Sequence, residues 1–519
     1  MYSGVMERVY VKEQEEAETP EFFQDLNLIQ IVKELQEKRK EYDIRRLYLR
    51  YPKDYETVVY RHGIYREIRQ KKLEEGLKNF SYKMREARKY EKLYRRADHE
   101  QQWRMYFFNQ VSEYITGMFS LKEELLRASV ESEGLSGLLE YVESFCGNPL
   151  WEECREEIDR IQEMLAGLRF GLSISGEDLK VTTELKEQYY FEYLKKLFPE
   201  KFTDKKGSYG ILQDYLLSSP FATSEMLSYL EGAIVDMYRK TRPDFFDTLA
   251  KFYKRFEKIV EADVYRVEEE LQFYLVFAEF QEEMENHGCV FCEPRVDRNG
   301  RFSVRQVYDI ALARKNRWME KEVVSNSVQY NESERFLIVT GPNQGGKTTF
   351  ARSLGQAVYL AMMGLDVPAE SAALPYFEGI LTHFSVEESL ESGRGKLKEE
   401  LVRLQPMMQA EYGNQFVILN ELFTTAATYD AFVMGQRVLK HFLEQGCLGV
   451  YVTHIAELTK ACEGLVSLVA LADERDHRKR TFRIVRKEAE GIGYAGDIVE
   501  KHRLGYEELR GRLKEGGIA

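Results

Sequence analysis

The sequence has few of the features that mark secreted, disordered or membrane proteins. It contains 6 cysteines and 11 prolines in 519 residues, too few for a disulfide framework or for extensive proline-rich disorder. No apolar run approaches the ~18 residues that a membrane-spanning helix needs, and the N-terminal residues lack the cationic and apolar regions of a signal peptide. The net charge of -13 excludes a uniformly basic nucleic-acid coat. We therefore expect a cytoplasmic protein.

One short cysteine-containing motif could bind a metal: HGCVFC, which holds His287, Cys289 and Cys292. Such a cluster can form half of a zinc site, but the chain has no second ligand pair at matching spacing. We therefore favour reduced, packed thiols and predict no metal at this motif.

Residues 25 to about 290 have a helical pattern. Apolar residues recur at spacings of three and four through 28–41, 65–96 and 242–286, with many Glu, Lys and Arg between them. The last of these segments is long enough for one continuous rod, which would connect distant parts of the molecule.

A basic segment lies within this helical region. Residues 31–104 hold 22 Lys and Arg against 13 Asp and Glu, interleaved with nine tyrosines. Such a segment can bind a phosphate backbone. The alternative, solvated helix faces packed by tyrosines, explains the same pattern at least as well.

After about residue 305 short apolar runs alternate with helical stretches. The runs at 336–340, 416–419 and 449–453 predict buried strands, and the alternation favours a parallel sheet flanked by helices. More than one domain is expected from the chain length as well. The predicted fold class is thus multidomain, with a long α-helical region followed by an α/β domain. The motif GPNQGGKT at 341–348 indicates that the latter is a P-loop ATPase domain of ABC-like type.

A phosphate-binding motif follows the first predicted strand. The segment TGPNQGGKTT fits G-x-x-x-x-G-K-[ST] and precedes a helical pattern. Glycines let backbone N–H groups curl around a phosphate, Lys347 supplies a point charge and Thr348 offers a hydroxyl to Mg²⁺. The predicted nucleotide-binding residues of the loop are Gly341, Pro342, Asn343, Gln344, Gly345, Gly346, Lys347, Thr348 and Thr349.

The next two predicted strands end in polar residues. The run 416–419 is followed by Asn420 and Glu421, and the run 449–453 by His454. In a P-loop ATPase the first position helps to hold Mg²⁺ and the following glutamate orients the attacking water. We predict Lys347, Glu421 and His454 as catalytic residues, with Thr348 and Asn420 at the metal.

With these elements in place, the C-terminal part resembles the ATPase domain of the MutS family, whose P-loop reads GPN-x-GGK-[ST]-T. Further segments match in order over about 180 residues: VPAES at 367–371, ESLESGR at 388–394, TYD at 428–430 and TH-x-x-EL at 453–458. The resemblance implies ATP and Mg²⁺ as cofactors and a homodimer with shared sites. It places Asn326 against the adenine and puts the signature loop of one subunit over the nucleotide of the other, through Ser392, Gly393 and Arg394.

A weaker resemblance upstream implies the domain division. We predict an N-terminal extension over 1–24, a helical core, lever and clamp-like region over 25–304, and a MutS-type P-loop ATPase domain with a C-terminal helical tail over 305–519. The clamp would fall between about 175 and 240, where the most plausible DNA phosphate contacts are Lys201, Lys205 and Lys206.

Departures from the family pattern qualify the expected activity. The mismatch-reading N-terminal domain has no counterpart, so the chain resembles a short form of the family. Asn420 stands where the family has a magnesium-side Asp, Phe423-Thr424-Thr425 replaces a glycine-arginine-glycine turn, and Gly395 replaces a serine. We therefore expect slow hydrolysis.

The overall prediction is an ATP-dependent DNA-binding protein of the mismatch-repair type, in which ATP binding and hydrolysis drive clamp movement on mismatched or branched DNA. Other repair proteins are possible partners, and no membrane partner is expected. The first alternative is a nucleotide-dependent protein-interaction scaffold with weak or no hydrolysis, favoured by the acidic net charge. An ABC-type transporter subunit shares the P-loop, but the fused helical region and the VPAES segment speak against it.

Overall fold

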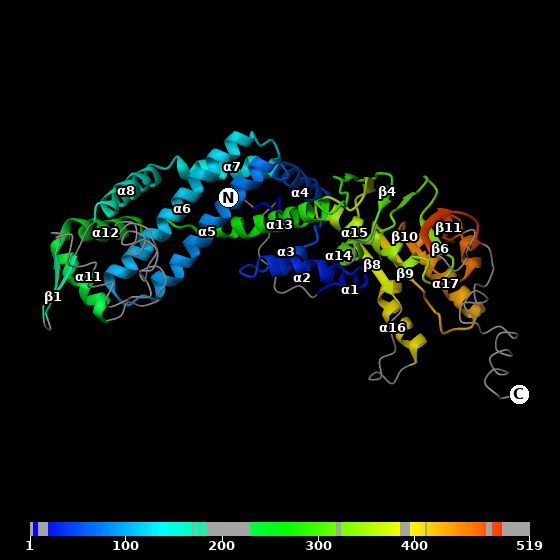
Figure 1. The fold of residues 1–519 in the computed structure, drawn as a ribbon. Coiled ribbons are helices and arrows are strands. Elements are labelled where there is room, and N and C mark those ends of the chain that lie inside the picture. Colours follow the sequence, from blue (N-terminus) through cyan, green and yellow to red (C-terminus); the bar gives the residue numbers. More distant parts are fainter. Residues whose placement is uncertain are drawn as a thin grey trace, which may run out of the picture.

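The computed structural model describes residues 4–8, 19–168, 171–175, 178–182, 229–317, 323–384, 395–409, 413–473 and 480–489. The described part is elongated, with a helical body at one end and an α/β part with two sheets at the other (Figure 1). The helix-rich and mixed α/β architecture agrees with the predicted fold class. The domain boundaries at 24/25 and 304/305 stay predictions.

The helical body contains most of the helices and one β-hairpin. Its elements are α1 (Glu21–Asp25), α2 (Leu28–Lys38), α3 (Ile44–Tyr48), α4 (Tyr55–Ile68), α5 (Lys71–Arg96), α6 (Glu100–Ala128), α7 (Glu133–Cys146), α8 (Pro149–Ala166), β1 (Gly171–Ser175), β2 (Asp178–Thr182), α11 (Tyr229–Thr241), α12 (Pro243–Phe256) and α13 (Ala262–Glu285). Side-chain caps define several starts, because Asp54, Ser132 and Asn148 each accept a hydrogen bond from an amide in the first turn that follows.

The predicted single rod over 242–286 is wrong, because the structure divides it into α12 and α13. The two helices are separated by residues 257–261, where Ile259 is buried and the amide of Glu261 donates to the hydroxyl of Tyr114. The segment 65–96 is divided in the same way at residues 69–70. Apolar spacing continues across both breaks, so periodicity alone does not reveal them.

The helix α13 forms the centre of the body. Its middle residues 270–278 are buried on all sides rather than along one stripe, and the helix packs against α2, α3, α4 and α5. Its glutamates pair with cations of the basic segment: Glu268 with Arg88, Glu279 with Arg39, Glu283 with Lys38 and Glu285 with Arg69.

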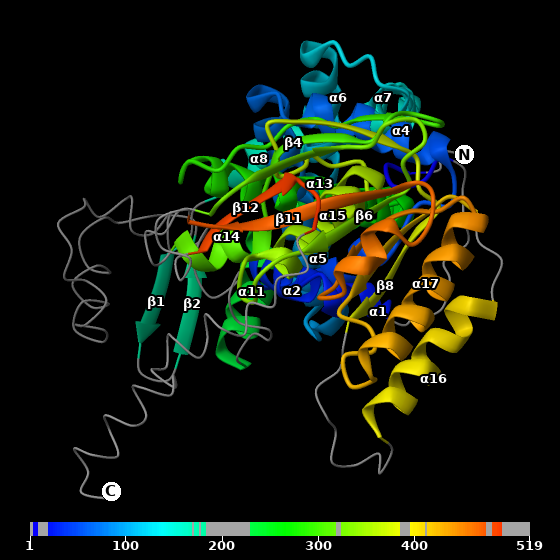
Figure 2. The same cartoon turned by 90° about the vertical axis from the view of Figure 1, so that its right-hand side faces the viewer.

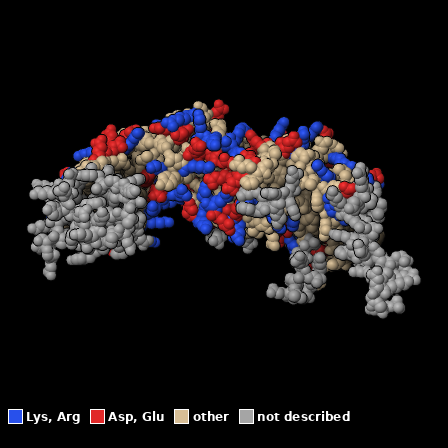
Figure 3. All heavy atoms as spheres, in the orientation of Figure 1, with Lys and Arg blue, Asp and Glu red and all other residues tan. Residues whose placement is uncertain are grey.

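These pairs favour the packing interpretation of the basic segment. Tyr42, Tyr48, Tyr60 and Tyr65 are buried in the core, and part of the local positive excess is matched in space by acids of α13 that lie about 180 to 245 residues away in the chain. On the face in Figure 3, both signs of charge are mixed over the body. Packing therefore accounts for these buried tyrosines and paired cations of the segment.

Among the residues that the structure describes, the α/β part contains two sheets, four α-helices and one 3-10 helix. Its elements are β3 (Arg295–Asp297), β4 (Ser303–Val307), α14 (Ile310–Arg317), β5 (Asn326–Gln329), β6 (Phe336–Thr340), α15 (Lys347–Met362), β7 (Ser371–Pro375), β8 (Gly379–Phe384), α16 (Lys396–Gln409), β9 (Gln415–Asn420), α17 (Thr428–Glu444), β10 (Leu448–Val452), the 3-10 helix η2 (Ala456–Lys460), β11 (Leu465–Ala472) and β12 (Arg480–Arg486).

The larger sheet has the strand order β12-β11-β6-β10-β9-β8. All its neighbours are parallel except β12, which runs antiparallel to β11. The predicted parallel sheet is thus observed, with β6, β9 and β10 at the three predicted strands. The smaller sheet has the order β3-β7-β4-β5. The helices α16 and α17 lie side by side (Figure 2) and pack against one face of the larger sheet, where their apolar residues join a cluster with Phe336, Leu419 and Tyr451.

The helix α15 connects the two parts of the molecule. It begins directly after the glycine-rich loop, and its C-terminal end reaches α4, where the His62 ring bonds to the carbonyl of Ala361 at 2.7 Å. Along its length the Tyr359 hydroxyl donates to the carbonyl of Tyr48 at 2.7 Å. No helix among the described residues is long and apolar enough to cross a membrane.

Candidate functional site

Three predicted polar segments converge at one edge of the larger sheet. The strands β6, β10 and β9 are parallel neighbours in that order, so their C-terminal ends meet at the same edge. The glycine-rich loop follows β6, Asn420 ends β9 and Glu421 follows it, and His454 follows β10. The parallel sheet therefore brings together residues that are separated by more than 100 positions in the chain.

The loop itself is shaped by residues with positive φ. These angles are 121° at Gly341, 59° at Gln344 and 90° at Gly346. A Cβ atom at Gly341 would lie 2.8 Å from the carbonyl oxygen of Ala470 on β11. Glycine is therefore required there for two reasons, conformation and close approach to the neighbouring strand.

Lys347 lies at the centre of the loop. The residue is 5% exposed, and its Nζ donates to the carbonyl oxygens of Gly341 and Pro342 at 3.0 and 3.2 Å. Burial lowers the pKa of Lys347, an effect that the charge of Glu421 opposes and that of Arg480 reinforces. The ammonium group is thus partly desolvated while its hydrogen-bond partners are neutral carbonyls, which suits exchange for an anion.

The predicted metal residues are in contact. The hydroxyl of Thr348, in the first turn of α15, donates to Oδ1 of Asn420 at 2.9 Å. Hydroxyl and amide oxygens are ligands that Mg²⁺ accepts, directly or through its waters. This oxygen pair beside Lys347 fits a magnesium ion next to a phosphate, although it carries no negative charge of its own.

Glu421 and His454 form the second contact. Oε1 of Glu421 and Nε2 of His454 are 2.9 Å apart, and both side chains are partly exposed. Glu421 has a φ of 53°, an uncommon conformation for a residue with a side chain and one that clusters at functional sites. A carboxylate bonded to an imidazole can hold and move a proton.

The remaining loop residues surround this centre. Pro342 accepts from the amide of Gly345 at 3.2 Å, which closes the turn, and Thr349 lies in the first turn of α15. The carbonyl of Asn343 accepts from Nε of Arg480 at 3.1 Å. A helix start leaves its first amides without intrahelical acceptors, and here they face the phosphate-binding side of the loop.

Asn326 has a structural partner in the described chain. Its amide group donates to the carbonyl of Phe482 at 3.1 Å and accepts from the amide of Ile484 at 2.8 Å. The side chain thereby joins β5 to β12. A contact between Asn326 and adenine stays a prediction.

Sequence analysis missed two residues of β12 that lie at the loop. Phe482 is 46% exposed, and a Cβ atom at Gly346 would lie 3.3 Å from its ring. An exposed aromatic ring beside a phosphate-binding loop offers a stacking surface for a base. Arg480, two positions earlier, contacts the loop through Asn343. No short motif marks either residue, because both lie more than 130 positions after the loop.

The residue Glu400 of α16 was missed as well. It is 1% exposed, and its carboxylate accepts the amide of Phe423 at 3.1 Å, two positions after Glu421. Phe423 has a φ of 61°. Glu400 thus stabilises the strained segment that carries Glu421, a role that no sequence pattern indicates.

Several predicted residues lie outside the described part. These are the signature-loop residues Ser392, Gly393 and Arg394 and the clamp lysines Lys201, Lys205 and Lys206. Their roles stay predictions. Among the described residues, no group of three or more His, Cys, Asp and Glu is placed to hold a metal; the Cys292 thiol is partly buried, which raises its pKa to about 12.

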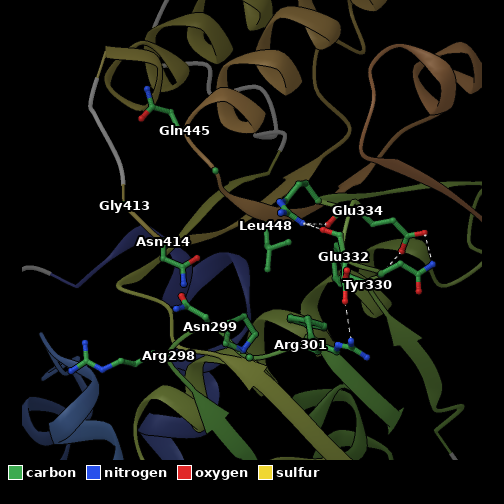
Figure 4. Close-up of a pocket in the computed structure, with 16 residues that line it drawn as sticks. Arg298, Asn299, Arg301, Tyr330, Glu332, Glu334, Gly413, Asn414, Gln445 and Leu448 are labelled. Atoms are coloured by element: carbon green, nitrogen blue, oxygen red, sulfur yellow. Dashed lines mark hydrogen bonds and ion pairs between the residues drawn. The ribbon is translucent and has the colours of Figure 1, made fainter.

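A polar pocket of about 530 Å³ lies at the opposite edge of the larger sheet, where β6, β9 and β10 begin (Figure 4). Arg301 and Arg335 line it, yet Arg301 pairs with Glu332 and Arg335 donates to the carbonyls of Glu332 and Glu334. Its arginines therefore have partners within the protein, and the pocket is separate from the loop site.

Comparison with known proteins shows similarity to the MutS family. MutS domain V matches residues 337–495, which span the loop, Asn420, Glu421 and His454. A DNA mismatch repair protein MutS of Streptococcus thermophilus is 24% identical over 370 residues, 67% of this chain and 40% of the relative. Proteins of the same name from Streptococcus uberis and Syntrophomonas wolfei are 32% and 30% identical over 28% and 35% of this chain and 17% and 21% of their own length. The chain thus aligns with well under two thirds of each relative, and its C-terminal part matches MutS domain V.

Proposed function

We propose that this chain binds and slowly hydrolyses ATP at the glycine-rich loop and couples that reaction to DNA binding. The observation that carries the proposal is the convergence of Lys347, the Thr348–Asn420 pair and the Glu421–His454 pair at one sheet edge. Each supplies one part that phosphoryl transfer to water requires: charge on the phosphates, a metal position and a group to orient water.

Binding begins with the loop. The Lys347 ammonium exchanges its bonds to the Gly341 and Pro342 carbonyls for bonds to phosphate oxygens, and the first amides of α15 donate to the same group. Thr348 and Asn420 hold the metal position. A bound magnesium ion neutralises charge on the transferring phosphate. The exposed ring of Phe482 provides a surface on which the base stacks.

Hydrolysis is assigned to Glu421. Its carboxylate orients a water molecule for attack and accepts a proton, and His454 holds that carboxylate in place. Because Asn420 carries no charge, the metal position is weaker than one with an aspartate, and turnover is slow.

The test of this assignment compares Glu421→Gln with wild type. The amide keeps a hydrogen-bonding oxygen but loses the basic carboxylate, so steady-state turnover should fall by about 10²–10⁴-fold while ATP affinity stays within about threefold. Equal turnover in the two proteins would contradict the role of Glu421.

The DNA part of the proposal rests on the family relation. The relatives' names refer to DNA mismatch repair, and the long α5–α6 pair gives the protein an arm that extends away from the sheet (Figure 1). We propose a homodimer whose arms move on duplex DNA when both loop sites bind ATP, with each signature loop capping the partner's nucleotide.

A filter-binding experiment with mismatched, branched and plain duplexes tests DNA binding. Phosphate contacts must give affinity that falls as salt rises, with a negative log–log slope. A slope of zero, or no binding to any duplex in the presence of ATP, would favour the nucleotide-dependent protein-interaction scaffold. Sedimentation with and without ATP tests the dimer in the same preparations.

A further inference from the structure

Two side chains one turn apart on α13 bind the backbone of a short segment that precedes α1. The carboxylate of Glu270 accepts hydrogen bonds from the amides of Val5 and Met6 at 2.8 and 3.4 Å. The hydroxyl of Tyr274 donates to the carbonyl of Val5 at 2.6 Å. Glu270 is 5% exposed and Tyr274 is 0% exposed. Buried polar groups without partners are costly, so both side chains depend on the segment for part of their hydrogen bonding.

Two adjacent residues of α4 bind the same segment from another side. The hydroxyl of Tyr60 donates to the carbonyl of Gly4 at 2.7 Å, and Nε of the buried Arg61 donates to the carbonyl of Met6 at 2.7 Å. The two helices thus bind five successive backbone polar groups, from the Gly4 carbonyl to the Met6 carbonyl, through side chains. Bonds to the main chain provide affinity in peptide-binding sites, and the fit of the side chains provides specificity.

The site also selects the residue type at each position of the segment. Gly4 has a φ of 117°, and a Cβ atom there would lie 2.2 Å from the carboxylate of Glu270, so glycine is required. The side chains of Val5 and Met6 are both 0% exposed. Glu7 places its carboxylate 3.1 Å from the guanidinium group contributed by α4. The segment that fits is therefore a glycine, two apolar residues and a carboxylate, in that order.

The segment is bound where the helical body meets α15. Nη1 of Arg61 lies 3.9 Å from the sulfur of Met363, the residue that follows α15. A Cβ atom at Gly364 would lie 2.3 Å from Cβ of Arg61. One side chain thus contacts both the segment and the C-terminal end of α15.

We propose that these side chains of α4 and α13 form a peptide-binding site, which residues 4–7 of the same chain occupy as a tethered ligand. The class of ligand is a short peptide with glycine, two apolar residues and a carboxylate. Because Glu7 neutralises Arg61 beside α15, the ligand stabilises the contact between the helical body and α15 while it is bound. The site shares no residue with the glycine-rich loop, so the two sites can be tested separately.

The experiment uses the full chain with Val5→Asp and Met6→Asp together. Two carboxylates at fully buried positions beside Glu270 should displace the segment from its site. A fluorescent peptide of residues 2–9, YSGVMERV, is then titrated with the double variant and with wild type, and anisotropy measures binding. We expect saturable 1:1 binding to the double variant and at least about tenfold weaker binding to wild type, where the tethered copy competes. Equal affinity for the two proteins, or no binding to a double variant that melts cooperatively, would overturn the proposal.

Peptide variants test the selectivity of the site in the double variant. Gly4→Ala in the peptide should weaken binding by about tenfold or more, because the added Cβ meets the Glu270 carboxylate. Glu7→Gln should weaken it by a similar factor, because it removes the partner of a buried guanidinium group. The matched control is Arg8→Gln, which removes a charge whose partner Glu133 is exposed and should change affinity by less than about threefold. Equal affinity of all four peptides would mean that the peptide binds elsewhere.

Hydrogen exchange on the wild-type chain decides the case in which the double variant does not fold. The amides of Val5 and Met6 are bonded to Glu270 and should be protected. A tethered ligand leaves its site without unfolding the helices, so this protection should be at least about tenfold below that of the buried middle of α13. Protection equal to that of α13 would make the segment an integral part of the fold, and no protection would mean that it is not bound. Either result would overturn the proposal.

Discussion

The two ends of α15 each meet a buried cation, and the two cations differ in their partners. Lys347 begins the helix and bonds to two neutral carbonyls. At the other end the Arg61 side chain, 0% exposed, bonds to the carbonyls of Met6 and Arg50 and to the carboxylate of Glu7. The charge of Arg61 is neutralised within the fold by Glu7, whereas the direct partners of Lys347 are neutral carbonyl groups. Buried charge without a carboxylate partner is therefore the mark of the ligand site.

The contacts around the C-terminal end of α15 support a structural role for Arg61. Gly364 follows the helix with a φ of 81°, and a Cβ atom there would lie 2.3 Å from Cβ of Arg61. The amides of Gly364 and Leu365 donate back to the carbonyls of Ala361 and Leu360. This is the glycine cap that ends many helices, and it brings α15 into direct contact with α4.

The largest loss of stability should come from removing the Arg61 side chain, whose charge is neutralised by Glu7. Arg61→Ala removes one partner of a buried ion pair and leaves Glu7 and two carbonyls without their donor, so the free energy of unfolding should fall by about 3–5 kcal/mol. Urea denaturation measures it. The control is Arg66→Ala, which breaks the exposed pair with Glu293 and should cost about 0–1 kcal/mol. Equal losses in both variants would remove the distinction between the two charges.

The stability of the protein should depend on pH through His62, which lies where α4 meets the C-terminal end of α15. Burial lowers the pKa of His62 to about 4 from 6.5. The unfolded chain therefore binds a proton more readily between these values, so stability is retained above pH 6.5 and falls as the pH drops toward 4, by about 1.4 kcal/mol per pH unit. His62→Gln should remove this part of the slope in melts between pH 7 and 5. The slope is not expected to vanish, because burial lowers the pKa of His383 to about 4 as well.

Adding a carboxylate near the N-terminal end of α15 should increase the affinity of the Thr348–Asn420 position for Mg²⁺. Asn420→Asp restores a negative charge beside Thr348, and the Mg²⁺ concentration for half-maximal turnover should fall by about tenfold, or about 1.4 kcal/mol. A magnesium titration of steady-state ATPase measures this. If neither protein turns over at any magnesium concentration, the chain is an ATP-gated binder rather than an enzyme.

The smallest change in stability is expected when the charge of Lys347 is removed and no nucleotide is bound. Lys347→Met replaces a partly desolvated ammonium by an apolar chain of similar length, so the free energy of unfolding should stay within about 1 kcal/mol of wild type. A loss as large as that of Arg61→Ala would mean that Lys347 is a structural residue of the fold.

The difference between local motifs and tertiary contacts explains which residues of the site could be predicted from the sequence. The loop, Asn420, Glu421 and His454 each follow a buried strand, and parallel strands bring such residues to one edge, so local motifs sufficed for the Thr348–Asn420 contact. Arg480 belongs to the same site, but its place depends on β12 pairing with β11 and on the bonds of Asn326, which are tertiary features without a local pattern.

The helical body shows the limits of periodicity in another way. Apolar spacing predicted its helices, yet the break between α12 and α13 depends on the Tyr114 hydroxyl, which binds the Glu261 amide from a different helix. The apparent positive excess over 31–104 is likewise reduced when the acids of α13 are counted in space. Charge within a sequence window does not describe the charge of a folded surface.

The central claim is that Lys347 is held for an anionic ligand and not for the fold. It is tested most directly by calorimetric titration of Mg·ATP into wild type and Lys347→Ala, with a thermal melt of both proteins without nucleotide. The account predicts a loss of affinity of about 100-fold or more with unchanged unfolding. Equal affinity in the two proteins, or a variant that fails to fold, would contradict it.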